Sequence, residues 1–433
     1  MQKPLRLFFD NVGDANLRHA KVHVNLPISF DNFFEEPYFK EVGAEFLPLS
    51  AWDPSGETPG AYFINVCNTP GFWCPTVFSA LSREVLDAVN SGTMLLVFNS
   101  YTEGREFEIE HGFSTLHLMM KNYGIPPHGV IVITGSFNMG EIYHKWCLDK
   151  NLAVMIDFFY MPCHYGFTNT KIQKGDKTLP IEKAIKDPAS KDYMSLNQTV
   201  KEHRVSHLYE LINRNILDKG MVSGHYQQNY QHGDIPSWTY TPFYSDAKIH
   251  EWDEKLQNNL PVSADGDWIE IHPDNSPQGI FNIALYEKTL CSFVTESEFH
   301  QNAVFLTEKT TKCLASGHPF ILLSAPNSLS YLEKQGFKVD FAGIDNSYDK
   351  ELNHRKRFQQ AHESLNKWVN LSRQEKLECI EQSMPVLQHN ANLMATMYGH
   401  HSWEISSYIK ERFQEMSLLI TYNLDSVYQH LHG

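Results

Sequence analysis

Short apolar runs alternate with helix-spaced apolar positions along the first 160 residues. The runs at 5–9, 93–98, 129–134 and 152–156 have the length and composition of buried strands. Apolar residues at 113–120 and 139–148 recur instead at helical spacing. This β-α-β-α-β order predicts a parallel sheet covered by helices, and thus a first Rossmann-like lobe over residues 1–163.

The alternation of strand and helix patterns resumes after a polar segment. Residues 164–190 lose periodicity and gain Gly, Lys, Thr and Pro, which predicts a linker or insertion. Strands are then expected at 193–197, 291–295 and 320–323, with helices at 204–212, 308–315 and 328–335. We therefore expect a second lobe at 191–350 and C-terminal helices at 351–433, in an α/β fold of two Rossmann-like lobes.

Composition narrows the class of protein. A chain of 433 residues favours two domains, and 42% hydrophobic and 13% aromatic residues indicate a folded chain. Neither a signal peptide nor an apolar stretch of about 18 residues is present, so we expect a cytoplasmic protein without a membrane span. Seven cysteines without a CxxC pair indicate reduced thiols. The formal charge of -15 disfavours broad binding to nucleic acid.

The segment Thr307-Glu308-Lys309 combines a helix start with residues suited to an anion. Helix N-termini offer backbone N–H groups and a positive dipole end, both of which suit a diphosphate. Lys309 adds a charge for phosphates, and Glu308 can accept hydrogen bonds from ribose hydroxyls. The alternative is an ordinary helix start with Thr307 as its N-cap.

Two blocks of the sequence resemble a known family. The run from Val304 to Leu323 resembles the donor-binding motif of fucosyltransferase-type and related two-lobed (GT-B) glycosyltransferases, where a Thr-Glu-Lys helix start precedes a small-residue turn, a Pro and an apolar strand. Upstream, Ser195-Leu-Asn197, Arg204 and Met221-Val-Ser-Gly224 are similar to an earlier block of that family. Leu329, Gly336-Phe337 and Ser347-Tyr348-Asp349 also resemble bacteriophage-encoded proteins assigned as glycosyltransferases.

The resemblance implies roles for individual residues. Arg204 and Lys309 would contact the donor pyrophosphate, Glu308 the ribose, and Asn197 the edge of the donor pocket. It departs from the fucosyltransferase pattern at Thr310-Thr311 and at His318, which leaves the sugar and the base open.

Acidic residues near strand ends are the remaining candidates. Glu296 follows a strand of the second lobe and is either a contact of base or ribose or a solvated loop acid. A catalytic base is expected from the first lobe, because the acceptor hydroxyl needs a carboxylate nearby. Glu103 is the first candidate, and Asp10 and Asp14 are the second, with a surface-loop role as the alternative.

The sequence gives no support for a metal centre. Asp265-Gly-Asp267 matches the DxD of single-lobed glycosyltransferases, but Asp-Gly is also a common turn. No HExxH and no Cys/His block with finger spacing accompanies the 22 histidines. We expect no required cofactor, with a divalent metal left open.

Three functional hypotheses follow. The first is a glycosyltransferase that holds a nucleotide-sugar donor between its lobes and transfers the sugar to an acceptor hydroxyl. The second, from the bacteriophage resemblance, is a transferase acting on hydroxymethylated pyrimidine in phage DNA, in the host cytoplasm, with a duplex held by Arg355, Lys356 and Arg357. The third is a non-catalytic nucleotide- or sugar-binding protein.

Overall fold

The protein consists of two compact units. One comprises Met1–Cys163 and Tyr398–Gly433, and the other comprises His164–Met397. The computed structural model describes residues 5–9, 44–53, 60–65, 75, 77–100, 109–160, 178–197, 201–224, 255–256, 258–260, 262, 264, 282–396 and 411–412.

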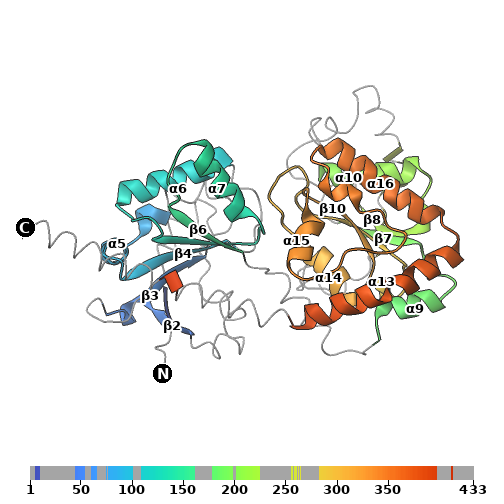
Figure 1. The fold of residues 1–433 in the computed structure, drawn as a ribbon, viewed down its shortest axis with the longest axis horizontal. Coiled ribbons are helices and arrows are strands. Elements are labelled where there is room, and N and C mark those ends of the chain that lie inside the picture. Colours follow the sequence, from blue (N-terminus) through green and yellow to red (C-terminus); the bar gives the residue numbers. More distant parts are fainter. Residues whose placement is uncertain are drawn as a thin grey trace, which may run out of the picture. The chain divides into compact units, whose positions relative to one another are not determined.

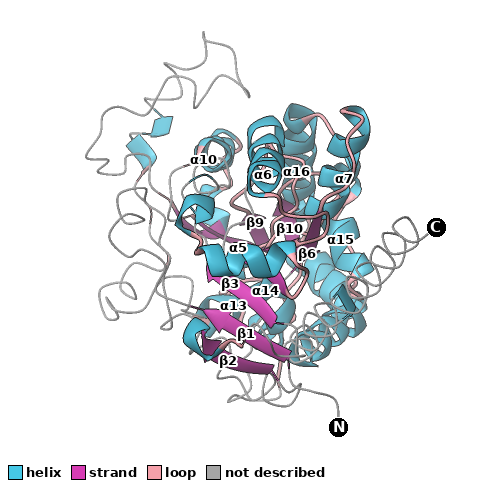
Figure 2. Ribbon diagram, turned by 90° about the vertical axis from the view of Figure 1, so that its left-hand side faces the viewer, coloured by secondary structure: helices cyan, strands magenta, loops and turns pink. Residues whose placement is uncertain are grey.

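The first unit contains a six-stranded parallel sheet with strand order β2-β1-β3-β4-β5-β6. Its strands are β1 (Leu5–Phe9), β2 (Ala44–Pro48), β3 (Gly60–Asn65), β4 (Met94–Ser100), β5 (Val130–Thr134) and β6 (Ile156–Tyr160). In Figure 2, β3, β1 and β2 lie edge to edge in this order. The apolar runs of β4 and β5 are buried, as expected for strands covered on both faces.

Three helices connect the later strands of this sheet. They are α5 (Arg83–Asn90), α6 (Ile109–Tyr123) and α7 (Met139–Asp149), and a short 3-10 turn, η1, covers Leu49–Ala51. The helices α6 and α7 lie side by side over the sheet (Figure 1). An α/β unit with a parallel sheet, as predicted for the first lobe, is therefore confirmed.

The predicted strand at 152–156 is wrong by four residues. Helix α7 ends at Asp149, and Asn151 takes a left-handed φ of 53°, which turns the chain outward. Leu152 is 44% exposed, whereas Ile156 is buried and pairs with Val130 at the start of β6. An apolar residue that follows a helix end is thus not a strand residue here.

The second unit contains a four-stranded parallel sheet with order β10-β9-β7-β8. Its strands are β7 (Tyr193–Leu196), β8 (Gly220–Ser223), β9 (Ser292–Thr295) and β10 (Phe320–Leu323). Its helices are α9 (Pro180–Lys186), α10 (Glu202–Asn213), α13 (Ile283–Tyr286), α14 (Glu308–Ser316), α15 (Ser328–Lys334) and α16 (His354–Asn370). The 3-10 turns η2 (Leu217–Lys219) and η5 (Ser347–Lys350) and a helical stretch at 373–396 complete it.

The last part of the linker or insertion expected at 164–190 contains a helix. Helix α9 starts with Pro180 and buries Ile181 and Ala184 against the second unit, where it contacts α13. The burial of these side chains makes the segment part of the unit. The chain does pass from one unit to the other after Cys163, where the first predicted lobe ends.

The C-terminal helices expected at 351–433 are present at 354–370 and 373–396 of the described residues, but they are part of the second unit. Helix α16 buries Phe358, Leu365 and Trp368 and packs against β10, so it belongs to the second unit. Residues from Tyr398 onward belong to the first unit instead. There the Nη2 of Arg412 donates to Oδ1 of Asp157 in β6, at 3.0 Å.

The order of strands in the second sheet marks one point at which the chain changes direction. From β7 the chain proceeds through α10 to β8 on one side, and from β9 it proceeds through α14 to β10 on the other. The strands β7 and β9 are neighbours, with Met194 opposite Ser292. Open α/β sheets bind ligands outside the carboxyl ends of the two strands at such a switch point.

Candidate functional site

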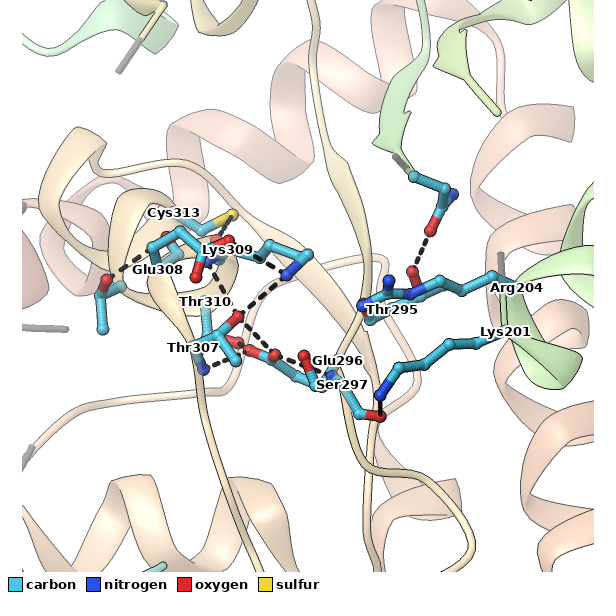
Figure 3. Close-up of polar contacts among 12 residues, drawn as sticks. Lys201, Arg204, Thr295, Glu296, Ser297, Thr307, Glu308, Lys309, Thr310 and Cys313 are labelled. Atoms are coloured by element: carbon cyan, nitrogen blue, oxygen red, sulfur yellow. Dashed lines mark hydrogen bonds and ion pairs between the residues drawn. The ribbon is translucent and has the colours of Figure 1, made fainter. Parts of the chain in front are cut away.

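The candidate site lies where β7 and β9 end. Asn197 follows β7, Glu296 follows β9, and α10 and α14 begin on the two sides of this point. Figure 3 shows Lys201 and Arg204 reaching from α10, with Lys309 on the other side of Glu296. All six predicted donor-binding residues lie in this region: Asn197, Arg204, Glu296, Thr307, Glu308 and Lys309. The predicted acids Glu103, Asp10 and Asp14 lie outside the described residues.

Glu296 holds the start of α14 to the end of β9. Its side chain is fully buried. Its Oε1 accepts from the backbone N of Thr307 at 2.9 Å and from Oγ1 of Thr310 at 2.6 Å. Its Oε2 accepts from Oγ1 of Thr307 at 2.7 Å and from the backbone N of Ser297 at 3.3 Å. The carboxylate therefore has four protein donors and acts here as the anchor of a helix rather than as a solvated loop acid.

Lys309 and Glu308 are paired at the first turn of α14. The Nζ of Lys309 lies 3.1 Å from Oε1 of Glu308 and 3.2 Å from Oγ1 of Thr307. Thr307 is the N-cap, with extended backbone, and its Oγ1 also accepts from the backbone N of Lys309 at 3.4 Å. The Lys309 side chain keeps 23% of its surface exposed. A bound anion can therefore reach the ammonium and exchange with its present partners.

Helix α10 holds the segment after β9 through three consecutive backbone carbonyls. The Nη2 of Arg204 donates to the carbonyl of Thr295 at 3.3 Å. The Nε2 of His203 donates to the carbonyl of Glu296 at 2.8 Å, and Nζ of Lys201 to that of Ser297 at 2.6 Å. We name these three side chains the α10 clamp. It fixes the backbone from which the Glu296 side chain reaches α14.

Burial shapes the charge of the α10 clamp. Burial lowers the pKa of His203 well below its usual value, and the neighbouring Arg204 lowers it further, so the imidazole is neutral. Burial also lowers the pKa of Arg204, opposed by the carboxylates of Glu296 and Glu308. An arginine remains protonated under these conditions.

Charges at the site are matched in number. Lys201 lies 3.5 Å from Oε1 of Glu298, and Lys309 pairs with Glu308. Among the described residues the site thus contains three cations and three carboxylates: Lys201, Arg204, Lys309, Glu296, Glu298 and Glu308. With side-chain charges balanced, the N-terminal dipole of α14 adds a positive potential that attracts an anion.

Glu202, at the start of α10, forms a pair with His300. Its Oε2 lies 3.5 Å from Nε2 of His300, and its Oε1 is buried without a hydrogen-bond partner among the described residues. Burial raises the pKa of Glu202 to about 7. Burial, with His354 and Arg357, lowers the pKa of His300 to about 4. Both shifts favour a pair without charge.

Glu202→Gln is expected to stabilise the protein at pH 8 and to have a much smaller effect at pH 5. The pKa of Glu202 lies above its ordinary value of 4.5, so the folded state retains a proton that the unfolded state loses. The resulting destabilisation grows as the pH rises from about 4.5 to 7 and is complete above that window. We expect a gain of about 1–3 kcal/mol at pH 8 in urea unfolding.

The exposed variant Glu363→Gln, with the same change of charge on α16, is the control for Glu202→Gln. Glu363→Gln should change the free energy of unfolding by the same amount at pH 5 and at pH 8. An equal effect of Glu202→Gln at pH 5 and pH 8 would contradict the assignment of a neutral carboxyl.

Metal ligands and membrane-spanning helices were both considered for the described residues. In the part of the chain that the structure describes, no three His, Cys, Asp or Glu side chains are placed to hold a metal ion. Asp265 and Asp267 lie outside it. None of the described helices has the length and apolar character needed to cross a membrane.

The basic cluster proposed to hold a DNA duplex is not a continuous exposed surface. Arg355 and Lys356 are exposed, but Arg357 is only 2% exposed, and its guanidinium donates to backbone carbonyls inside the second unit. The expectation that all three cations face a duplex is therefore wrong for Arg357.

Several residues of the site were not predicted from the sequence. Lys201 and His203 belong to the α10 clamp, and Thr310 is a ligand of the Glu296 carboxylate. Thr310 stands three residues after the N-cap, a spacing that places both hydroxyls on the same end of a helix. No comparable sequence signal marks Lys201 and His203, since their acceptors are backbone carbonyls.

Comparisons with known proteins add no assignment. No known protein family matches this chain, and no curated protein is significantly similar to it in sequence.

Proposed function

We propose that this chain is a glycosyltransferase of the GT-B type that binds a nucleotide-sugar donor at the carboxyl edge of the second sheet. One observation carries the proposal: Arg204 and Lys309 belong to the two helices that begin on either side of the switch point. Cations and a helix N-terminus at this position suit the diphosphate of a nucleotide. The resemblance of the Thr307-Glu308-Lys309 segment to a donor-binding motif supports the same role.

Donor binding would exchange internal contacts for contacts with the ligand. The phosphates would take the Lys309 ammonium from Glu308 and Thr307, which lie 3.1 and 3.2 Å from it. The freed carboxylate of Glu308 would then accept hydrogen bonds from the ribose hydroxyls. Glu296, with its four protein donors, would hold α14 in place and would not contact the nucleotide.

The proposed chemistry is departure of the nucleoside diphosphate as the acceptor hydroxyl attacks the anomeric carbon. The bond from this carbon to the diphosphate oxygen breaks, and negative charge develops on that oxygen. Lys309, Arg204 and the N–H groups of α14 would stabilise this charge. If transfer inverts the sugar, a carboxylate accepts the proton of the acceptor, and Glu103, Asp10 and Asp14 remain the candidates.

The proposal is tested by calorimetric titration of nucleoside diphosphates and their sugars into the full chain. We expect selective binding of one base, weakened about 10- to 100-fold in Lys309→Ala and Arg204→Ala, because each change removes a charged contact. Lys312→Ala is the matched control, since it removes the same charge from the same helix. Binding of no nucleotide, or equal binding by all four proteins, would refute the donor site.

Glu308→Gln separates the two parts of the donor. Loss of its negative charge should strengthen binding of inorganic diphosphate, because Lys309 is released from its partner. The gain should be smaller for the nucleoside diphosphate, because an amide is a poorer acceptor for ribose hydroxyls. An equal change in affinity for both ligands would contradict the proposed division of roles.

Catalysis is tested by release of the nucleoside diphosphate from the donor that binds. A transferase should release the nucleoside diphosphate faster when an acceptor is added. Donor binding without release across a panel of saccharide, protein and hydroxymethylated DNA acceptors would favour a non-catalytic binding protein.

A further inference from the structure

A chain of buried hydrogen bonds joins α16 to the ends of β7 and β9. The Nδ1 of His362 lies 2.8 Å from the carbonyl of Phe358, and its Nε2 lies 2.9 Å from Nδ1 of His207. The Nε2 of His207 lies 2.9 Å from Oγ of Ser195, which lies 3.1 Å from Nδ2 of Asn197. The Oδ1 of Asn197 accepts from the Thr295 hydroxyl. We name this series the histidine chain.

Only one placement of protons satisfies the histidine chain when both rings are neutral. A carbonyl can only accept, so Nδ1 of His362 carries hydrogen and its Nε2 is an acceptor. His207 must then donate from Nδ1 and accept at Nε2. Ser195 therefore donates to His207 and accepts from Nδ2 of Asn197. The direction of every bond follows from the backbone of α16.

The two histidines are neutral at neutral pH. Burial lowers the pKa of His207 well below its usual value and that of His362 to about 4. The titratable groups facing His362 are Glu210, which raises its pKa, and Arg214, which lowers it. Those facing His207 are His362 and His203, which both lower its pKa. His207 also stacks on Phe293, with ring centroids 4.3 Å apart. A neutral imidazole has one donor and one acceptor, as the order requires.

We propose that His207 and His362 are positioning residues of the donor site, because they fix the orientation of the Asn197 amide between the ends of β7 and β9. The hydroxyls of Ser195 and Thr295 can each donate or accept, so alone they would permit either orientation of that amide. Because Nε2 of His207 accepts a hydrogen bond from the Ser195 hydroxyl, only one orientation of the Asn197 amide remains. The consequence for donor binding rests on the proposed function, whereas the proton order does not.

The link to the donor runs through Thr295. Its hydroxyl donates to Asn197, and its carbonyl accepts from Nη2 of Arg204 at 3.3 Å. The histidine chain thus fixes the residue that holds the guanidinium proposed to bind phosphate. A disordered amide at Asn197 would loosen Thr295 and, with it, Arg204.

The first test compares His207→Gln with His207→Leu. A glutamine amide can accept from Ser195 through its oxygen and donate to His362 through its nitrogen, so it preserves the direction of the chain. Leucine interrupts it. We expect donor affinity within about twofold of wild type for His207→Gln and about tenfold weaker for His207→Leu, since small misplacement of binding groups is costly. Equal affinity in the two variants would overturn the positioning role.

The second test reads the protons directly and does not require a donor. Nitrogen-15 NMR of the full chain at pH 7 should show two neutral rings in wild type, each with its hydrogen on Nδ1 and none on Nε2. An ionised carboxylate can only accept, so in the ionised form of Asn197→Asp the Ser195 hydroxyl turns toward position 197, His207 donates from Nε2, and one of the two rings takes up a proton. Hydrogen on Nε2 of either ring in wild type would overturn the proton order.

The outcomes separate this proposal from the proposed function. If no nucleotide binds but both rings carry their hydrogen on Nδ1, the donor site is wrong and the proton order stands. If a nucleotide binds and His207→Leu binds it as well as His207→Gln does, the donor site stands and the positioning role is wrong.

Discussion

Replacing Arg357 by leucine is expected to lower the free energy of unfolding of the second unit by about 4 kcal/mol, because a buried hydrogen-bonded charge is removed and its partners are left behind. The guanidinium donates to the carbonyls of Phe299 at 2.7 Å, Ser324 at 3.1 Å and Glu351 at 2.7 Å. It also lies over the Phe299 ring, 4.6 Å from its centroid. These carbonyls come from three separate segments, and leucine supplies a donor to none of them.

Calorimetric melting of the full chain measures this loss. The melting temperature of the second unit should fall by about 10 °C in Arg357→Leu, given the usual relation between unfolding free energy and melting temperature for units of this size. Arg355→Leu, at an exposed position on the same helix, should leave it within about 1 °C, since exposed substitutions change stability little. A shift in Arg357→Leu no larger than in Arg355→Leu would show that the three carbonyls find other donors.

Glu296→Gln is expected to cost about 3 kcal/mol and to abolish nucleotide binding as a secondary effect. Four donors surround the carboxylate, and two of them are the backbone N–H groups of Thr307 and Ser297, which can only donate. A glutamine amide presents an NH₂ group in place of one oxygen, so at least one buried donor faces another donor. The first turn of α14 should then detach from β9.

Hydrogen exchange distinguishes this detachment from general unfolding. Amides of α14 should exchange faster in Glu296→Gln than those of α16, which has no contact with this carboxylate in the described hydrogen bonds. Glu298→Gln is the control, because it makes the same change of charge in a carboxylate that pairs with Lys201. Uniform acceleration across both helices would contradict an anchoring role for Glu296.

Most strands could be predicted because their sequences carry the signal of burial on both faces. The apolar runs of β5 and β10 are buried throughout, and their boundaries follow from the polar residues on either side. Strands β2, β3 and β8 were not predicted, and β6 was predicted four residues too early. Leu152 and Ile156 are both apolar, and only their distance from the end of α7 decides which one enters the sheet.

The candidate site was predicted in part from the sequence. Glu296 and Thr307 were recognised as polar residues near element ends. Of the α10 clamp, Lys201 and His203 were not recognised, because the carbonyls that they hold come from residues about 90 positions away and carry no sequence signal.

Arg357 was misinterpreted for a different reason. Grouping it with Arg355 and Lys356 treated neighbouring charges as one surface. In a helix, however, adjacent residues point in different directions, and Arg357 shares its face with Ala361 and Ser364, which are buried. Helical periodicity, applied to the charged residues as well as to the apolar ones, would have placed it inside.

The division of the first unit into two stretches of sequence affects the order in which the protein can fold as it is synthesised. Residues Met1–Cys163 leave the ribosome first, but the residues from Tyr398 onward, including the Arg412 partner of Asp157, emerge only after His164–Met397 has been made. The second unit is continuous and can complete its core during translation. The contact of Arg412 with Asp157 in the first unit therefore forms only after the second unit has been synthesised.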